Sequence, residues 1–592
     1  MKIPICKMLE RCGSTLRSAL LQRVAAVGLY LIIALATTWP VMQAPATTFP
    51  MGTTQAVTVP LFNVWTIWWN ADRAAHGFEG YWDAPIFHPA KDAFAFSELQ
   101  ITSLIVAPII WFNGSRVLAY NVYLWLSLVL NGVFAERLLR VLKVRSWAAI
   151  GGGAAMVLLP IVHWQLDVIQ LAPIWGILWC WTACWQATHL PDLARWPTAL
   201  ARGIEIGAAI SLTFHSCGHH GLFLGLLAVA TCWLLPRRWL DRRLWISFLA
   251  ACIVVAVTVG PFAIHMTRVM KAHNFVRTDA LIGSLSGMPQ DYLVAPGAQL
   301  IEWGSKWARP YWYLSPGWIK LVLASVAIGL GLSRRRTRRV TLFLTLTVGV
   351  SFAMSLGTNL KLGSWQPWPV MAKYVPGLGQ VRNVFRFAFF TQIAVVIMAA
   401  QAVWWTWLRL RLKLRHQPSC RRIAWIGCFV LTAAFAFEVR PYRIMVGGAP
   451  NEVANAAWID FVKQQTPDGS AVLCLPYPKA YECRDFEVTT RWMYYGTFHG
   501  KPLVNGYSGF FPLEYFGTQD AINAPASYGG VLAKLESQRV HFVVIAPEDT
   551  RIEPVRTATF GPVQLELVFA DPVGVSVYKL RRLPPPAIVL PN

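Results

Sequence analysis

The stretch that decides the fold is residues 24–43, VAAVGLYLIIALATTWPVMQ. At about 1.5 Å per residue, a helix of this length crosses the roughly 30 Å hydrocarbon core of a bilayer. Five cations precede it: Lys2, Lys7, Arg11, Arg17 and Arg23. The positive-inside rule places these cations in the cytoplasm. We therefore predict a first membrane span preceded by a cytoplasmic N-terminal segment, residues 1–23.

A cleaved signal peptide is the alternative, because Ala44-Pro45-Ala46 resembles a small-residue cleavage site. The apolar run is longer than the usual h-region of about 7–15 residues, which favours the span. The topology of the following chain is the same in both cases.

Ten further apolar stretches are candidate spans. They are Leu118–Phe134, Trp147–Val162, Val168–Thr188, Gly203–Cys217, Leu222–Leu235, Leu244–Ile264, Trp318–Leu332, Val340–Leu356, Phe385–Leu408 and Ile423–Phe437. Composition agrees, since 55% of the 592 residues are hydrophobic and only 14% are charged, against about 25% charged in soluble domains. We predict a mainly α, polytopic membrane bundle of about eleven transmembrane helices.

The net charge of +24 would favour nucleic acid if the cations formed one patch. Alternating the spans from a cytoplasmic N-terminus instead places every cationic cluster in the cytoplasm. These clusters are Arg137–Arg145, Arg195–Arg202, Arg237–Arg243, Arg334–Arg339 and Arg409–Arg422. The excess charge is mostly a topology signal, so we expect membrane lipid and no nucleic acid as a partner.

The membrane domain, residues 24–439, leaves three long outer loops, 44–116, 265–317 and 357–383. Residues 440–592 form a predicted extracytoplasmic α/β domain, with a helix over Asn451–Gln465. Four apolar runs in it predict strands, and the last two form a hairpin. They are Ala471–Leu475, His541–Ile545, Leu565–Ala570 and Gly574–Leu580.

The cysteines and histidines leave two questions open. Cys474 and Cys483 lie in an oxidising compartment, so a bridge between them and a pair of free thiols are both compatible with the sequence. His215, His219 and His220 could hold a metal, although a packed polar turn explains them better.

The first outer loop is the most informative segment. Pro60–Arg73 contains Phe62-Asn63-Val64-Trp65 and Trp68-Trp69 and suits a helix at the membrane interface. Tyr81–Pro89 places Asp83 among aromatic residues. Ile101–Phe112 is a short apolar run that we expect to lie flat or re-enter, because a crossing here would move the following cationic cluster outside.

This arrangement resembles the GT-C membrane glycosyltransferases, in particular bacterial members that take sugar from a polyprenyl-phosphate carrier. The resemblance covers the architecture of the whole chain, including one span, a large outer loop, many further spans and an outer C-terminal domain. The resemblance is based on six short segments. They are the tryptophan-rich segment and Asp83–Pro89 described above, together with Ala119–Asn121, Val375–Gly377, Val381–Phe387 and His499–Gly509.

The resemblance implies a carboxylate in the first outer loop that acts as base or steers a metal, so a divalent metal stays an open cofactor. No Asp or Glu occurs between Ala44 and Ala71. We therefore expect the catalytic acid later in the loop, at Asp83 first, with Asp72 and Glu98 behind it.

Displacing a lipid phosphate from an anomeric carbon also needs cations that stabilise the leaving phosphate. Arg382 and Arg386 are four residues apart, and we expect them on one helix face at the outer mouth of a span. Lys373 lies nearby, and His163 falls in an outer turn. Anchoring to lipid headgroups is the alternative role for the two arginines.

We therefore predict a membrane glycosyltransferase in a bacterial inner membrane that moves sugar from a polyprenyl-phosphate donor to an extracytoplasmic glycan, lipid or protein acceptor. Two alternatives stay open. One is a non-catalytic relative that binds glycan or lipid-linked sugar, and the other is a transporter or flippase of lipid-linked sugars. The latter predicts ionisable groups at mid-membrane, where we find only Glu205 and Lys320.

Overall fold

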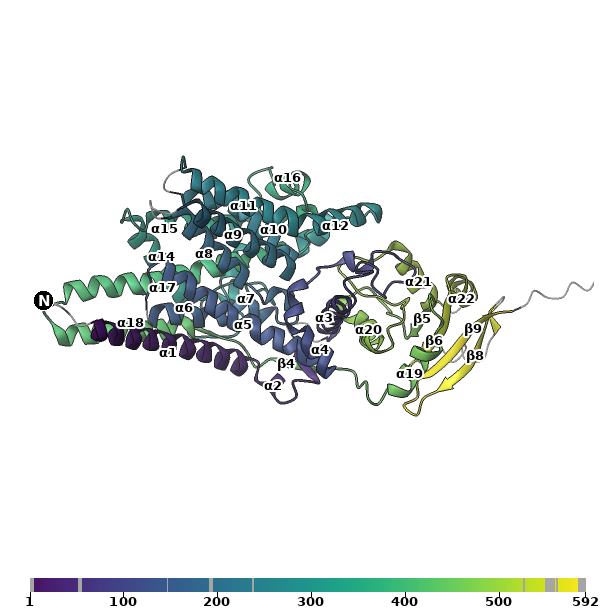
Figure 1. Ribbon diagram of the computed structural model, residues 1–592. Coiled ribbons are helices and arrows are strands. Elements are labelled where there is room, and N and C mark those ends of the chain that lie inside the picture. The colour runs from purple at the N-terminus through teal and green to yellow at the C-terminus, as the bar shows by residue number, and fades with distance from the viewer. Residues whose placement is uncertain are drawn as a thin grey trace, which may run out of the picture. The chain divides into compact units, whose positions relative to one another are not determined.

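The computed structural model describes residues 5–51, 56–145, 147–190, 195–236, 239–524, 527–548, 559–560 and 563–583. The chain forms two compact units (Figure 1). Unit 1 comprises Met1–Gln43, Val122–Phe262 and Val276–Ile444, and unit 2 comprises Ala44–Asn121, Ala263–Phe275 and Met445–Asn592. The C-terminal segment therefore shares its unit with the whole first predicted outer loop.

Unit 1 is helical, and each of the eleven predicted spans falls on a helix. These helices are α1 (Ile5–Thr37), α5 (Arg116–Val141), α6 (Trp147–Val157), α8 (Trp175–Thr188), α9 (Trp196–Ser216), α10 (Gly218–Thr231), α11 (Arg242–Thr258), α14 (Trp318–Leu332), α15 (Arg338–Ser355), α17 (Ala388–Lys413) and α18 (Pro418–Ala436). Of the predicted cytoplasmic cations, Lys2, Arg237 and Arg238 lie outside the described residues.

Within the described residues, five stretches are long and apolar enough to cross a membrane. They are Leu20–Thr37, Arg116–Val141, Trp147–Trp164, Val384–Lys413 and Pro418–Ala436. α11 and α12 (Gly260–Ala272) would make a sixth span as a pair bent by 49°. The chain is therefore a multi-pass membrane protein, and the count of eleven spans stays a prediction.

Helix α17 is the core of unit 1. Its side chains are buried without interruption over residues 388–403, and it packs against α6, α14, α15 and α18. A helix that is apolar on every side has no face for water, so it takes the centre of the bundle. The segment that precedes it, Val381–Phe387, is thereby held at the end of a rigid element.

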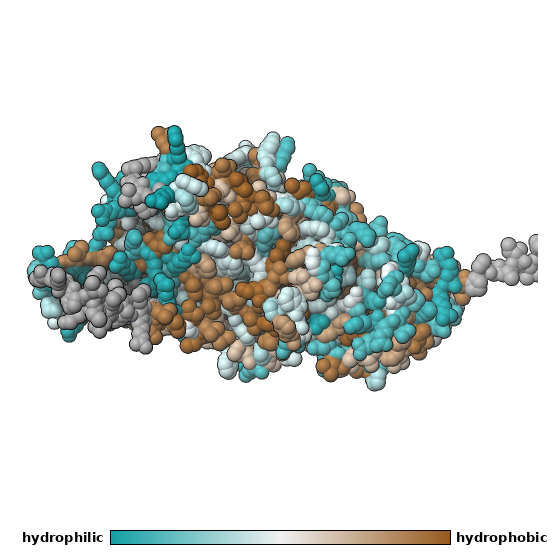
Figure 2. Space-filling view, viewed as in Figure 1, coloured by the Kyte–Doolittle hydropathy of each residue, from teal (hydrophilic) through white to brown (hydrophobic). Residues whose placement is uncertain are grey.

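The outward faces of α1, α11 and α18 are apolar as well. Their exposed side chains include Leu20, Leu21, Ile32, Phe248, Leu249, Val257, Ile423, Ile426 and Val430. Figure 2 shows apolar side chains gathered over α1 and α11. Such continuous surfaces are unfavourable in water and match a hydrocarbon environment.

Short elements form the rest of unit 1. They are α2 (Trp39–Met42), α7 (Pro160–Trp164), η3 (Ile169–Leu171), η4 (Cys232–Leu234), α13 (Asp279–Ser284), η5 (Pro289–Tyr292), β2 (Ala298–Gln299), η6 (Ser305–Trp307), η7 (Gly357–Asn359), α16 (Pro367–Tyr374), η8 (Leu378–Gln380), η9 (Val384–Phe387) and β3 (Val439–Arg440). Most of them lie in the second and third predicted outer loops.

Unit 2 contains a five-stranded sheet in the order β5-β6-β9-β8-β7. Its strands are β5 (Ala471–Leu475), β6 (Val540–Ile545), β7 (Thr559–Phe560), β8 (Val563–Ala570) and β9 (Ser576–Arg582). β5 and β6 pair in parallel, while β8 and β9 form the predicted antiparallel hairpin. The other elements of this segment are β4 (Met445–Gly448), α19 (Ala456–Gln465), η10 (Cys483–Phe486), α20 (Glu487–His499), α21 (Leu513–Asn523) and α22 (Tyr528–Ser537).

The first outer loop folds onto this C-terminal segment. Its elements are β1 (Thr48–Met51), α3 (Thr58–Ala75), η1 (Ala93–Phe96), η2 (Ile101–Val106) and α4 (Ala107–Asn113). β1 pairs antiparallel with β4, and α3 packs on α20. Further on, Phe87 N donates to Asn505 O at 3.2 Å, His88 N donates to Leu503 O at 2.9 Å, and Leu503 N donates to Pro85 O at 3.1 Å.

Helix α3 lies where a helix was predicted, but it is buried in protein and does not have the exposed face of the predicted interfacial helix. Its side chains from Pro60 to Ala71 are buried, including the polar Asn63 and Asn70. The aromatic run serves as protein core, with the Phe62 ring 5.5 Å from that of Tyr507. The apolar run Ile101–Asn113 differs, because Ile105, Trp111 and Phe112 are exposed.

Candidate functional site

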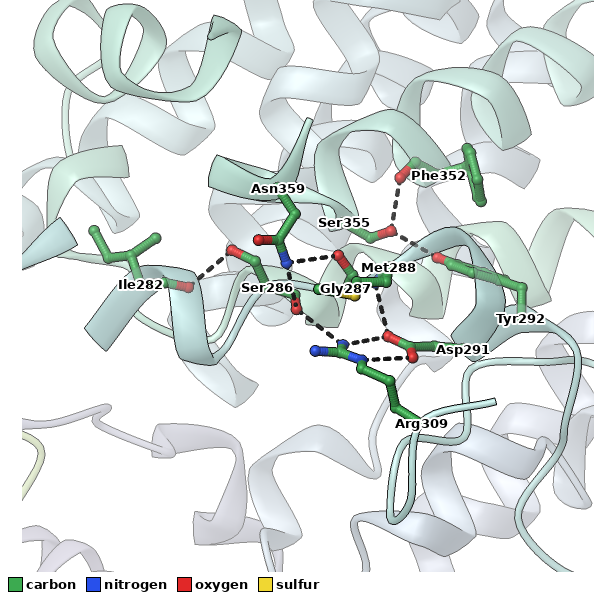
Figure 3. A network of polar contacts seen from close by, with 10 residues as sticks. All are labelled: Ile282, Ser286, Gly287, Met288, Asp291, Tyr292, Arg309, Phe352, Ser355 and Asn359. Atoms are coloured by element: carbon green, nitrogen blue, oxygen red, sulfur yellow. Dashed lines mark hydrogen bonds and ion pairs between the residues drawn. The ribbon is translucent and has the colours of Figure 1, made fainter. Parts of the chain in front are cut away.

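The part of unit 1 that contains the second predicted outer loop is built around a buried carboxylate, Asp291 (Figure 3). Arg309 donates from Nε to Asp291 Oδ1 at 2.9 Å and from a terminal nitrogen to Oδ2 at 2.5 Å. The backbone N of Met288 donates to the same carboxylate at 2.7 Å. A bidentate pair with a further donor neutralises a buried charge well, so this pair is an architectural anchor.

Hydrogen bonds extend from this pair to neighbouring segments (Figure 3). Arg309 donates to Ser286 O at 3.2 Å, and the Asn359 amide donates to Ser286 O and Gly287 O, both at 3.1 Å. The Tyr292 hydroxyl lies 2.7 Å from that of Ser355, at the end of α15. These contacts fix residues 279–292 against η7 and α15.

The fixed segment in turn touches the chain that leads into α17. Phe385 N donates to Leu285 O at 3.3 Å. Arg386, one residue further, is buried with 7% of its surface exposed. Two loops distant in sequence therefore meet where the predicted phosphate-binding arginines lie.

Arg277 is the residue that the sequence analysis missed at this place. It lies just before α13 and is half-buried. Burial first, and the like charge of Arg382 second, lower the pKa of the Arg277 guanidinium to about 9. The charge of Arg382 therefore acts on the Arg277 guanidinium. Nothing in the sequence pairs these residues, because they come from separate loops.

The expectation that Arg382 and Arg386 share a helix face is wrong. η9 begins at Val384, with Asn383 as its N-cap. Arg382 lies before the cap, and Val381 preceding it is extended. The chain enters α17 through a short irregular link, so a spacing of four residues does not bring the two side chains onto one face.

The other two predicted phosphate ligands lie elsewhere in unit 1. Lys373 is exposed near the end of α16, with its Nζ 5.4 Å from the Tyr374 ring centre. His163 is buried in α7, where its Nε2 lies 3.0 Å from Val157 O. Its Nδ1 has no hydrogen-bond partner within the described chain. These contacts do not assign a ligand to Lys373 or to His163.

Aromatic rings surround the entry to α17. The Phe385 ring lies 5.5 Å from Trp164 and 5.4 Å from Trp312. The Arg309 guanidinium stacks over Trp312, with 4.1 Å between Cζ and the ring centre. The arginine-bearing link thus has one apolar side, which suits an amphiphilic ligand with a charged head.

The three predicted acids belong to unit 2 and have different surroundings. Asp72, near the end of α3, accepts from Arg73 Nε at 2.9 Å and lies near the His76 ring. Asp83 is exposed in the turn after α3, and its Oδ1 accepts from Asp92 N at 3.1 Å. Glu98 is half-buried between η1 and η2.

Asp92 is a further loop acid with a specific partner. Its Oδ1 lies 2.9 Å from Nε2 of His265, in α12. The His265 ring stacks on Trp82 with 4.2 Å between ring centres. The sequence gives no signal for this pair, because its two residues lie in different outer loops.

Two smaller predictions concern cysteines and histidines. Cys474 and Cys483 do not form a disulfide with each other, and the first is buried while the second is exposed. Of the three clustered histidines, His215 lies 3.0 Å from Thr258 O through Nε2, and His220 packs against the Phe389 ring. The metal and packed-turn interpretations of the three histidines both stay predictions.

No family model matches the sequence, and no curated protein is similar to it in sequence. Solved structures are similar in fold. Two structures of a mutant arabinofuranosyltransferase AftD from Mycobacteria have TM-scores of 0.53 and 0.50 at 14% identity, and the alignments cover 94% of this chain and 41% of that chain. ArnT from Cupriavidus metallidurans bound to undecaprenyl phosphate has a TM-score of 0.46 at 11% identity, with 94% and 97% covered.

The chain therefore has the GT-C fold, as the sequence resemblance predicted. It spans 41% of the length of the AftD chains that it matches. At this level of identity the likeness concerns the fold, so activity has to be argued from the residues of this chain.

Proposed function

We propose that the protein is an integral membrane glycosyltransferase that moves a sugar from a polyprenyl-phosphate donor to an extracytoplasmic acceptor. The observation that carries the proposal is the chain that enters α17, where Arg382 precedes and the buried Arg386 follows Phe385, whose ring lies between those of Trp164 and Trp312. A lipid-linked phosphate combines an anionic head with an apolar chain, which suits arginines next to aromatic rings. The GT-C fold and the multi-pass helices are compatible with a donor held in the membrane.

In this reaction the acceptor oxygen attacks the anomeric carbon while the bond from that carbon to the phosphate oxygen breaks. The electron pair leaves with the phosphate, whose charge the arginines stabilise. The proton of the acceptor passes to a general base. We propose that this step depends on Asp83 first, and on Asp72 and Glu98 after it.

The remaining details of the proposal follow from the predicted topology. The cationic clusters lie in the cytoplasm, which puts both predicted site segments and the C-terminal sheet outside a bacterial inner membrane. Glycans, lipids and proteins are all acceptors compatible with an outer site. A divalent metal is left open.

The test uses the full chain in lipid nanodiscs with a radiolabelled sugar on a polyprenyl-phosphate carrier and an extract of envelope acceptors. We expect label to move to an acceptor. Arg382→Gln and Arg386→Gln should each lower the rate at least tenfold, and the triple variant Asp83→Asn, Asp72→Asn, Glu98→Gln should abolish transfer. Arg336→Gln, in an exposed cytoplasmic cluster, and Glu79→Gln, exposed in the first loop, are the matched controls.

Unchanged transfer in the triple acid variant would refute the assigned acids. A folded protein that binds the donor without turnover would favour the non-catalytic alternative. Movement of the intact donor across the bilayer without transfer would favour a flippase.

A further inference from the structure

Asp92, His265 and Trp82 form a cluster that the assigned acids do not explain. The cluster joins two outer loops within unit 2, with Asp92 Oδ1 2.9 Å from His265 Nε2. The Trp82 and His265 rings stack at 4.2 Å with an interplanar angle of 23°. The carboxylate fixes one ring nitrogen and the indole fixes the plane, so the imidazole has a defined orientation.

The orientation of Asp92 is fixed by its backbone conformation and by a hydrogen bond to Asp83. The residue adopts a left-handed conformation with φ of +55° and caps η1. Its backbone N–H donates to Asp83 Oδ1 at 3.1 Å. A non-glycine residue in this region is uncommon and needs support from its surroundings. Asp83 supplies that support and thereby helps to aim the Asp92 carboxylate at His265.

The pair is accessible as well as ordered. The His265 side chain is 30% exposed and that of Asp92 is 38% exposed. If the Nε2 proton is the one donated to Asp92, the lone pair of Nδ1 is the basic site of the ring. Nδ1 forms no hydrogen bond within the described chain. A neutral imidazole oriented by a carboxylate, with its second nitrogen open, is the arrangement that general-base catalysis uses.

His273 shows what a packing role looks like on the same segment. Its ring contacts Phe96 at 5.0 Å and stacks on Phe275 at 5.1 Å. Both of its neighbours are buried aromatic residues. His265 instead has a carboxylate and an aromatic platform at a partly exposed position.

We infer that Nδ1 of His265 is the atom that takes the proton of the acceptor hydroxyl, with Asp92 and Asp83 as positioning residues. This inference rests on the proposed function and identifies its base. As the acceptor oxygen bonds to the anomeric carbon, its proton moves to Nδ1 and the phosphate leaves with the electron pair of the broken bond. The imidazolium is stabilised by Asp92 and returns its proton to water.

The test compares His265→Ala, Asp92→Asn and Asp83→Asn with His273→Ala in the nanodisc transfer assay. His265→Ala should lower kcat/KM at least 100-fold, within the usual range for loss of a general base. Added imidazole should raise kcat/KM of His265→Ala at least tenfold, and should not raise kcat/KM of Asp83→Asn. His273→Ala should stay within threefold of the wild type.

A second measurement does not need turnover. Nitrogen-15 NMR of histidine-labelled protein should show neutral His265 with its proton on Nε2, and Asp92→Asn should shift that tautomer balance. A wild type without transfer would refute the proposed function but leave this spectrum as the test of the base. Transfer by His265→Ala within threefold of wild type, or a neutral ring protonated on Nδ1, would overturn the inference.

Discussion

Arg309 and Arg277 come from the same outer stretch of unit 1 but meet opposite electrostatic surroundings. Arg309 forms a bidentate pair with Asp291, which has no exposed surface. The pKa of Arg277 is lowered to about 9 by burial and by the like charge of Arg382. Where a buried charge meets its opposite, the contact holds loops together. Where cations of two loops act on each other, as Arg382 does on Arg277, we propose that the place binds the phosphate of a lipid-linked donor.

The largest effect is expected when the negative charge of Asp291, the partner of Arg309, is removed. Asp291→Asn keeps the shape of the side chain but leaves Arg309 without its carboxylate. Breaking a buried pair on one side costs about 3–5 kcal/mol, so we expect a large fall in Tm. Thermal unfolding in detergent checks this, and a change in Tm as small as that of the exposed variant Arg336→Gln would contradict it.

The second largest effect on stability is expected in unit 2, at the buried His499, whose pKa no opposite charge raises. Burial, and then Lys501, lower the pKa of His499 to about 3. The folded chain therefore keeps His499 neutral while the unfolded chain protonates it below about pH 6.5. Stability present at neutral pH should fall by about 2 kcal/mol at pH 5.

Thermal unfolding at pH 7.5 and pH 5.0 measures this loss, with His499→Gln as comparison. The glutamine does not titrate, so its variant should lose less stability between the two pH values. An equal loss in both proteins would assign the acid sensitivity to other groups.

The third prediction concerns the like-charged side of the comparison. Arg277→Gln should lower the affinity for a polyprenyl phosphate about tenfold, which corresponds to about 1.4 kcal/mol. It should leave Tm unchanged or slightly raised, because a repulsive contact disappears. Titration of the lipid into nanodiscs checks the affinity. A fall in Tm comparable to that of Asp291→Asn would show that Arg277 is architectural.

The smallest effect is expected for a pair near the surface. Arg73 and Asp72 are adjacent in α3, with about a fifth to a quarter of each side chain exposed. Water screens such pairs, and they contribute at most about 1 kcal/mol. Arg73→Gln should therefore change the free energy of unfolding by less than Asp291→Asn does. Chemical denaturation of the two variants provides the comparison.

The sequence predicts the helices well because apolar length and period are local properties. Each of the eleven predicted ranges overlaps a helix, and β5 agrees with the predicted Ala471–Leu475. Boundaries fare worse where tertiary contacts intervene. The helix predicted from Asn451 begins at Ala456, since Asn451 Oδ1 instead accepts from Ala454 N and closes a turn.

The candidate site could be predicted only in part. Arg382 and Arg386 are visible beside an apolar span, but Arg277 is not, because its closeness to Arg382 depends on how the segment around Asp291 is anchored. The pairing of Asp92 with His265 depends in the same way on α12 meeting the first loop. The packing of α3 against α20 also could not be predicted from the sequence, because an aromatic helix suits a lipid interface and a protein core alike.

The hydrogen bonds from residues 85–88 to residues 503–505 impose an order on biosynthesis. Roughly four hundred residues separate these two strands of backbone, so at about 5–20 residues per second the first loop waits about 20 to 80 s for its partner. During that interval the tryptophan-rich helix lacks the segment that later covers it. A nascent chain stopped before residue 500 should therefore expose the aromatic side chains of this helix.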